Sequence, residues 1–218
     1  MPIAIVPIKR NSTRVPNKNF LDLNGKPLLS YIFETLQSAT LFEDIYCYTS
    51  DPTISYLLPD GVKILPRDPR LDLDSATHEE LWNPAIEAMP KNSKILMTHA
   101  TSPLLSMTSI RKSYDVFNDG NYDSVFGVQE LKNHIWFAGR PLNYKLGNLT
   151  PTQNISPVLK ETNGIYFFKR EGFLTSQSRI HGKSKHFILS DHESLDIDNW
   201  IDFKVAEVLI KSEEGKSW

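Results

Sequence analysis

The stretch IAIVPIKRNSTRVPNKN, residues 3–19, combines a buried strand with a strongly basic loop. Its first six residues are apolar at almost every position, which is typical of a strand covered on both faces in a parallel sheet. The loop that follows contains Lys9, Arg10, Arg14 and Lys18, with neither an acid nor a glycine. The whole chain has a net charge of −2, so this basic loop is a local feature that needs its own explanation.

Beyond this stretch the chain alternates between strand-like and helix-like segments. Strand-like runs occur at residues 44–50, 62–65, 93–100, 122–129, 163–170 and 185–190, and helical spacing at 26–39, 77–89, 107–120, 171–178 and the end of 194–210. This alternation predicts βαβ units and hence a three-layer α/β/α domain around a mostly parallel sheet. A length of 218 residues suits one domain over residues 1–218. Residues 130–160 break the alternation and predict an inserted lobe.

The composition indicates a globular protein and argues against several other classes. Hydrophobic residues make up 40% and charged residues 23%, as in globular domains, and the slight acidity argues against a nucleic-acid binder. The single cysteine, Cys47, excludes an intramolecular disulfide and a multi-cysteine zinc site, and it favours a cytoplasmic protein. No apolar run has the length of a membrane span, and the first apolar run is too short for a signal peptide. We expect neither a membrane nor a nucleic acid as a partner.

The basic loop allows two interpretations. Ligands of such sheets bind at the carboxyl ends of the strands, and the polar segments 9–19, 49–51 and 99–103 all follow strands. The cations, the backbone amides and the hydroxyls of Ser12 and Thr13 could therefore surround a polyphosphate. The alternative is a solvated basic loop, which the position after a buried strand disfavours. Without glycines the loop is neither a Walker loop nor a dinucleotide fingerprint.

Near the end of the chain, the motif LDIDN carries Asp196 and Asp198. Two carboxylates two positions apart on an extended segment face the same side and could hold one Mg²⁺, together with water and phosphate oxygens. Alternatively, Asp198 or Asn199 caps the last helix. A metal beside a polyphosphate loop would fit phosphoryl or nucleotidyl transfer.

The segment THATSPLL, residues 98–105, also has two interpretations. It could form the floor of a substrate pocket, with His99 or Ser102 pointing inward. It could equally be a loop that leads into the next helix, with Ser106 or Thr108 as the cap.

Six segments together match a known family in order: 3–36, YTSD, LPRDPRLDLDSAT, HATSPLL, ETNGIYFFKR and LDIDNWIDFKVAE. On these segments the chain resembles the CMP-sugar cytidylyltransferases, in particular the acylneuraminate branch of CMP-sialic acid synthetase-like enzymes. Residues 131–156 match only in position. The resemblance implies a nucleotide-diphospho-sugar-transferase-like, Rossmann-like fold and transfer of CMP from CTP to an acidic sugar, with release of pyrophosphate. It also implies Mg²⁺, a homodimer formed through the lobe, and a place in cell-surface polysaccharide biosynthesis.

The resemblance further implies roles for single residues. Catalysis would fall to Arg14, Lys18, Asp196 and Asp198, and the last two would bind the metal. The nucleotide would contact Ile8, Lys9, Arg10, Asn11, Ser12, Thr13, Asn19 and Asp74. The acceptor would contact His99, Thr101, Ser102, Gln153, Glu161 and Asn163.

Several positions depart from the family pattern. Arg10 and Asn11 stand where the loop usually has glycines, and His99 where sialate enzymes usually have a glutamine. Gln153 and Glu161 stand where arginines suit the sugar carboxylate, and an acid at Glu161 would repel that carboxylate. We therefore predict a cytidylyltransferase for a sialic acid-like nonulosonate. The alternatives are a ketodeoxyoctonate-like sugar or a polyol as acceptor, or a nucleotide-binding module that has lost catalysis.

Overall fold

A single seven-stranded sheet forms the centre of the protein. The structure, a computed structural model, describes residues 1–147 and 150–214. The strands of the sheet are β1 (Ile3–Ile8), β4 (Asp44–Thr49), β5 (Val62–Pro66), β6 (Lys94–Met97), β7 (Ser124–Leu131), β10 (Val158–Lys169) and β11 (Ser184–Ile188). Their order is β11-β7-β10-β6-β1-β4-β5, and every neighbouring pair is parallel except the two that include β10. The predicted mostly parallel sheet is confirmed.

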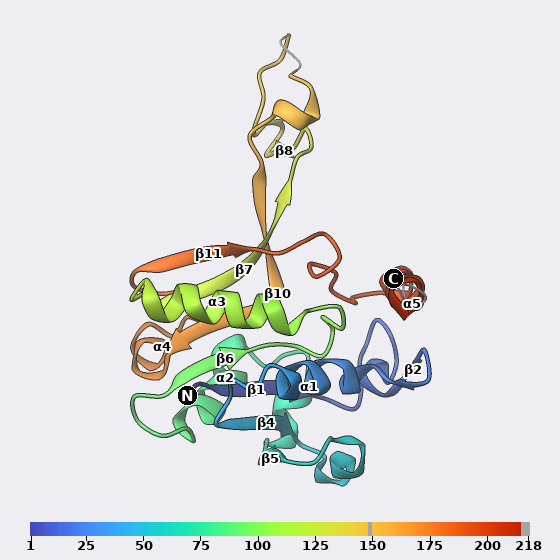
Figure 1. Ribbon diagram of the computed structural model, residues 1–218, viewed down its shortest axis with the longest axis vertical. Helices are drawn as coiled ribbons and strands as arrows, with labels where there is room; N and C mark the ends of the chain where they lie inside the picture. Colours follow the sequence, from blue (N-terminus) through green and yellow to red (C-terminus); the bar gives the residue numbers. More distant parts are fainter. Residues whose placement is uncertain (148–149, 215–218) are drawn as a thin grey trace.

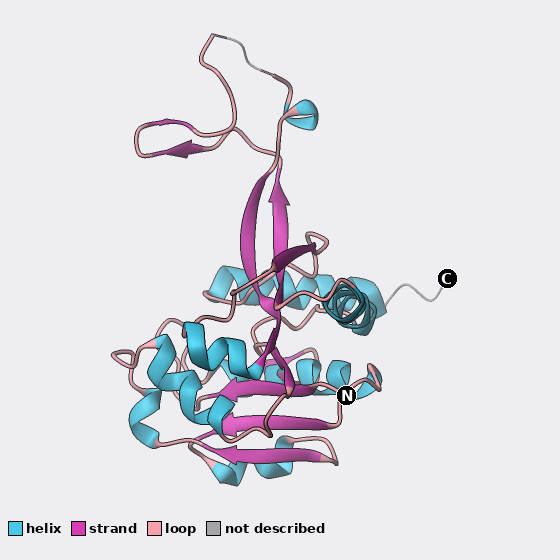
Figure 2. Ribbon diagram, turned by 90° about the vertical axis from the view of Figure 1, so that its left-hand side faces the viewer, coloured by secondary structure: helices cyan, strands magenta, loops and turns pink. Residues whose placement is uncertain are grey.

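Helices cover both faces of the sheet (Figure 2). The longer helices are α1 (Leu28–Ser38), α2 (His78–Glu87), α3 (Met107–Asp119), α4 (Arg170–Ser176) and α5 (Trp200–Glu214). Alternate residues of β1 point to opposite faces. Ala4 and Val6 share a buried cluster with side chains of α1 and α3, whereas Ile3 and Ile5 share another with side chains of α2 and α4. The three-layer α/β/α architecture predicted from the alternation is therefore present, and β1 is buried on both faces.

Short elements connect these layers. They are the 3₁₀ helices η1 (Lys18–Phe20), η2 (Pro52–Leu57), η3 (Pro69–Asp72) and η4 (Thr152–Asn154), and the two-residue strands β2 (Asp22–Leu23), β3 (Lys26–Pro27), β8 (Trp136–Phe137) and β9 (Arg140–Pro141). Thr77 and Glu80 form a capping box at the start of α2, and the Ser106 hydroxyl caps α3. Of the two residues that the sequence offered as the cap of this helix, Ser106 is the cap and Thr108 is not.

A projecting arm occupies the region predicted as an inserted lobe. Strands β7 and β10 continue past the sheet as an antiparallel ribbon, with Leu131 opposite Val158 (Figure 1). Beyond the ribbon, β8 and β9 form a small hairpin. Residues 148–149 of the predicted lobe lie outside the described residues. Because the chain returns from the arm directly beside β7, β10 runs antiparallel to its neighbours.

The last helix fixes the segment that carries the two aspartates. Its residues Phe203, Ala206 and Ile210 are buried in a cluster with Leu23 and Ile197. This packing holds residues 196–199 against the region that follows the basic loop. Trp200 and Val205 lie on the other face of this helix and are 50% and 42% exposed. In the described part of the chain, no helix is both long and apolar enough to span a membrane.

Candidate active site

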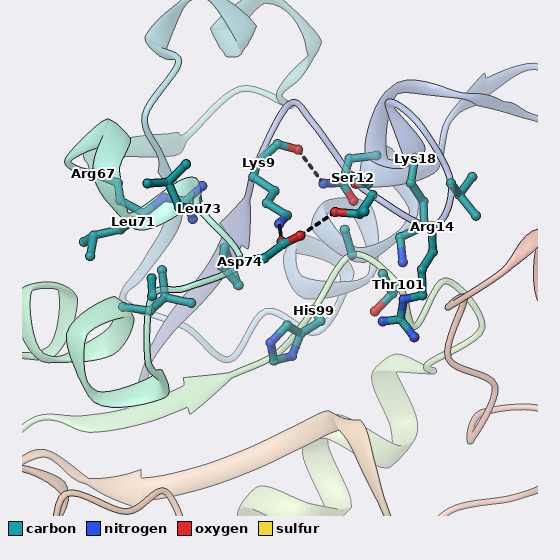
Figure 3. A pocket seen from close by; sticks show the side chains of 17 residues that line it. Lys9, Ser12, Arg14, Lys18, Arg67, Leu71, Leu73, Asp74, His99 and Thr101 are labelled. Atoms are coloured by element: carbon teal, nitrogen blue, oxygen red, sulfur yellow. Dashed lines mark hydrogen bonds and ion pairs between the residues drawn. The ribbon is translucent and has the colours of Figure 1, made fainter.

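A cavity of about 600 Å³ lies at the carboxyl ends of β1 and β6 (Figure 3). These strands are neighbours in the sheet, so the loops that follow them meet at one edge. Of the residues predicted for the site, the cavity is lined by Lys9, Ser12, Thr13, Arg14, Lys18, Asn19, Asp74, His99 and Thr101. The basic loop and the segment after β6 therefore form one cavity, as their positions after the strands predicted.

Asp74 ties the basic loop to the opposite wall of the cavity. Its carboxylate accepts hydrogen bonds from Thr13 Oγ1 at 2.6 Å and from Lys9 Nζ at 2.9 Å. The Thr13 hydroxyl, followed by Lys9, holds the pKa of Asp74 below its usual value. Asn19 adds an internal bond from its Nδ2 to the Lys9 carbonyl, at 3.0 Å. The loop is thus held in a defined shape without glycine.

Two further cations of the loop, Arg14 and Lys18, contact the segment near the end of the chain that carries Asp196 and Asp198. Arg14 Nη2 donates to Asp198 Oδ1 at 2.7 Å, and Lys18 Nζ donates to the Ile197 carbonyl. Lys18 is only 9% exposed. Burial lowers the pKa of Lys18, although the charges of Asp196 and Asp198 act in the opposite direction. Lys18, which lines the cavity, therefore lies beside the segment that carries the two carboxylates.

Asp196 and Asp198 are suited to hold a cation. Asp196 Oδ2 accepts from Asn163 Nδ2 at 2.6 Å, while its Oδ1 is buried and has no hydrogen-bond partner among the described residues. A buried carboxylate oxygen without a partner is costly unless a cation binds it. Among residues 1–147 and 150–214, no three His, Cys, Asp or Glu side chains are grouped for metal binding. Two carboxylates completed by water and phosphate are, however, a usual arrangement for Mg²⁺.

Asn199, and not Asp198, caps the last helix with its side chain. Its Oδ1 accepts from the amides of Ile201 at 2.8 Å and Asp202 at 3.1 Å, as an N-cap does. Asp202 Oδ2 in turn accepts from the amides of Asp198 and Asn199, both at 2.9 Å. The side chain of Asp198 is therefore not used as the cap and faces Arg14 instead.

His99, a predicted acceptor contact that lines the cavity, is held by Asn163, another predicted acceptor contact. His99 Nδ1 lies 3.0 Å from the Asn163 carbonyl oxygen. The His99 ring meets the Trp82 ring edge-on, with 6.0 Å between centroids and 79° between planes. Burial lowers the pKa of His99. The imidazole is accordingly neutral at physiological pH and fixed in orientation.

Glu161 does not present an uncompensated negative charge. Its Oε1 accepts from Arg179 Nη2 and from the Tyr166 hydroxyl, both at 2.6 Å. The Arg179 guanidinium also lies over the Tyr166 ring, 3.9 Å from its centroid. The repulsion expected between Glu161 and an acidic acceptor is thus offset by Arg179, a residue that the sequence reasoning missed because nothing in its local pattern marks it.

Half of the residues predicted for the site are not among those that line this cavity. Four of them, Asn163, Glu161, Asp196 and Asp198, make the contacts described above. The side chain of Ile8 is in the core, Ser102 is buried in the turn after β6, and Asn11 is exposed. Arg10 pairs with Asp51 at 2.7 Å. Gln153 lies in η4 of the arm, so it is not brought to the cavity of its own chain.

Arg67 lines the cavity although the sequence reasoning did not select it. Its buried guanidinium donates to the Ile8 carbonyl at 2.8 Å, the Tyr48 carbonyl at 3.2 Å and Asp72 at 2.5 Å. It therefore joins the ends of β1 and β4 to the wall that carries Asp74. The signal available in the sequence was an arginine directly after the strand VKILP.

The sequence of the chain matches a known family of proteins. The family model for cytidylyltransferases matches residues 3–171. The chain belongs to the cytidylyltransferase family. It is 24% identical over 218 residues to the N-acylneuraminate cytidylyltransferase of Streptococcus agalactiae serotype V, covering 93% of this chain and 51% of that protein. The chain thus spans about half the length of that relative.

A second relative has a similar length to this chain. The pseudaminic acid cytidylyltransferase of Campylobacter jejuni subsp. jejuni serotype O:2 is 25% identical over 226 residues, covering 96% of each chain. Among solved structures, a CMP:2-keto-3-deoxy-manno-octonic acid synthetase complexed with CTP matches with a TM-score of 0.71 and 12% identity. The match covers 98% of this chain and 100% of that one. At that identity it supports the fold alone.

Proposed function

We propose that this cytidylyltransferase transfers CMP from CTP to an acidic sugar of the sialic acid-like nonulosonate class, with release of pyrophosphate. The observation that carries the proposal is that Lys9, Arg14 and Lys18 line one cavity, while Arg14 pairs with Asp198 and Lys18 bonds to the Ile197 carbonyl between the two aspartates. Cations for a triphosphate and carboxylates for a metal are the two requirements of nucleotidyl transfer.

The chemistry is an in-line displacement at the α-phosphorus of CTP. The acceptor hydroxyl oxygen forms a bond to phosphorus, and the bond to the bridging oxygen breaks with its electron pair leaving on pyrophosphate. Arg14 and Lys18 stabilise the charge that develops on the phosphate oxygens. Asp196 and Asp198 would hold Mg²⁺, which when bound neutralises phosphate charge and acidifies the attacking hydroxyl.

The acceptor is the less determined half of the proposal. The named relatives are cytidylyltransferases for N-acylneuraminate and pseudaminic acid, and both names describe nonulosonates with a carboxylate. A ketodeoxyoctonate-like sugar or a polyol is the alternative within the same chemistry. The second candidate is a nucleotide-binding module without catalysis, which the glycine-free loop would permit.

Pyrophosphate release tests the proposal. The purified protein would be incubated with Mg²⁺ and CTP, and in turn with N-acetylneuraminate, pseudaminate and ketodeoxyoctonate. We expect release with CTP and one nonulosonate, and none with ATP, GTP or UTP or after addition of EDTA. Release with ketodeoxyoctonate alone would favour the first alternative. Calorimetric binding of CTP without turnover of any acceptor would favour the module.

We also propose that the arm joins two copies into a homodimer. Its described tip exposes the apolar side chains of Trp136, Phe137, Leu142 and Leu146, which a second copy could cover. Sedimentation at micromolar concentration should give twice the chain mass of 24.9 kDa. A monomeric mass would contradict the dimer. The cytoplasm is the compartment we propose, since the one cysteine is a buried free thiol.

A further inference from the structure

We infer that His99 is the general base of this reaction: its Nε2 accepts the proton that the acceptor hydroxyl loses as it attacks CTP. The inference rests on the proposed function and deepens it, because the residues considered so far supply cations and metal ligands but no proton acceptor.

The tautomer of His99 is fixed by its surroundings. A backbone carbonyl oxygen can only accept, so the 3.0 Å contact between Nδ1 and the Asn163 carbonyl requires hydrogen on Nδ1. The neutral ring then carries its lone pair on Nε2. The edge-on contact with Trp82 restrains the plane of the ring. His99 lines the cavity beside Thr101, so this lone pair is available to a bound acceptor (Figure 3).

Asn163 connects this base to the predicted metal-binding carboxylate. Its backbone carbonyl holds His99, and its side-chain Nδ2 donates to Asp196 Oδ2 at 2.6 Å. One residue of β10 therefore sets both the tautomer of the imidazole and the orientation of Asp196. His99 and Asp196 are thus joined through one residue, so a hydroxyl that attacks beside Asp196 has the neutral imidazole as the neighbouring proton acceptor that general-base catalysis requires.

The surroundings of His99 favour the unprotonated ring, mainly because the ring is shielded from water. Burial is the main cause that lowers the pKa of His99, while the Asn163 hydrogen bond and the charge of Asp196 raise it. The charge of Arg179 and, as the smallest contribution, that of His78 also lower the pKa of His99. Glu161 is paired with Arg179 and compensates part of that positive charge. The ring is thus neutral before the reaction and able to accept a proton.

The proton balance of the step is complete with His99. The acceptor oxygen forms its bond to the α-phosphorus, the electron pair of the broken bond leaves on pyrophosphate, and the hydroxyl proton moves to Nε2. The imidazolium then returns the proton to water once the products leave.

The test compares His99→Gln with His78→Gln. His78 is a half-buried histidine close to Trp82 that does not line the cavity, so its replacement is a matched control. Initial rates of pyrophosphate release would be measured from pH 5 to 9 with CTP, Mg²⁺, and N-acetylneuraminate or pseudaminate. In the wild type kcat should rise with pH through a pKa below 6.5 and then level off. His99→Gln should lower kcat by about 100- to 10,000-fold, remove this limb and leave the KM for CTP unchanged.

The outcomes distinguish a failure of the inference about His99 from a failure of the proposed function. If His99→Gln keeps the acidic limb and a kcat within tenfold of wild type, while His78→Gln behaves like wild type, the inference is wrong. If the wild type releases no pyrophosphate with any acceptor, the proposed function fails and the inference with it.

A second measurement does not depend on turnover or on the folding of the variant. Long-range ¹⁵N–¹H spectra of the wild-type imidazoles should contain a neutral ring protonated at Nδ1 whose signals move when N-acetylneuraminate or pseudaminate is added with CTP. A His99 ring protonated at Nε2 would overturn the inference.

Discussion

The two sides of the cavity differ in how they present charge. On the nucleotide side, each of the loop cations Lys9, Arg10 and Arg14 faces a carboxylate from elsewhere in the chain: Asp74, Asp51 and Asp198. On the acceptor side, the half-buried His99 packs against Trp82, and Glu161 pairs with Arg179. The cations of the nucleotide side can release their carboxylate partners and bind phosphates instead. The acceptor side carries little net charge, so it would recognise a ligand mainly through hydrogen bonds.

This difference separates function from stability on the nucleotide side. Exposed ion pairs contribute little to the free energy of unfolding, because water and salt screen them. Their value lies in holding long side chains in place before the ligand binds. Substitutions there should therefore reduce activity far more than they reduce stability.

Replacing Asp196 by Asn should have the largest effect. The amide can still accept the hydrogen bond from Asn163, but it removes the charge that the proposed Mg²⁺ site needs. We expect kcat to fall by at least about 1,000-fold, as for the loss of a main electrostatic contact, with an unchanged circular dichroism spectrum. Pyrophosphate release titrated with Mg²⁺ measures the effect.

Asp202→Asn is the matched control for that variant. Asp202 lies in the same segment but accepts from the amides of Asp198 and Asn199 at the start of α5. It should lower the melting temperature modestly, as the loss of a helix cap does, and keep the Mg²⁺ dependence of the wild type. Full activity in Asp196→Asn, or equal losses in both variants, would contradict the metal assignment.

The sequence predicts the nucleotide side better than the acceptor side, and the reason is physical. The strand 3–8, the capping box at Thr77 and the edge where the loops meet all follow from local patterns and from the topology of parallel sheets. The pairing of Arg14 with Asp198 could only be inferred from the resemblance, since the two residues are 184 positions apart. Local patterns contain no information on such contacts.

The acceptor side depends on the features that local patterns determine least. The antiparallel course of β10 follows from the arm, which ends the regular alternation. Arg179 lies in a loop after α4, and its role becomes visible only when it meets Glu161 and Tyr166. Likewise, the exposed Trp200 and buried Ile210 of α5 depend on where that helix packs.

Replacing Lys18 by Met should have the second largest effect. The ammonium that is lost would stabilise charge on the phosphates, so we expect a cost of about 2–4 kcal/mol in transition-state stabilisation, or about 30- to 1,000-fold in kcat/KM. The stability should change in the other direction. Because burial lowers the pKa of Lys18, the charged form destabilises the folded state at all pH values below that pKa.

Thermal unfolding at two pH values checks this trade between activity and stability. At pH 7 the methionine variant should melt at the same temperature as the wild type or higher. Toward pH 10 the difference should shrink, because the wild-type ammonium loses its proton and with it the penalty of burial. A large loss of stability at pH 7 would mean that the hydrogen bond to the Ile197 carbonyl and the charges of Asp196 and Asp198 outweigh the burial of Lys18.

Replacing Glu161 by Gln should have the smallest effect and tests the acceptor side directly. Glutamine can keep the hydrogen bonds to Arg179 and Tyr166 through its amide oxygen, but it leaves the charge of Arg179 uncompensated. An acidic acceptor should then bind about two- to fivefold more tightly, the range expected for a partly exposed charge contact. Kinetics with saturating CTP should show a lower KM for the acceptor and no change in the KM for CTP.

Arg179→Gln supplies the opposite change at the same ion pair, because it exposes the negative charge of Glu161 to the acceptor. The KM for an acidic acceptor should rise in this variant by a similar or larger factor. A neutral polyol acceptor should respond to neither variant, so the pair of measurements also distinguishes the acceptor classes. If both variants shift the KM for an acidic acceptor in the same direction, the ion pair acts through the shape of the wall. In that case the charge on the acceptor side would not select the substrate, and selection would fall to His99, Asn163 and the contacts they make.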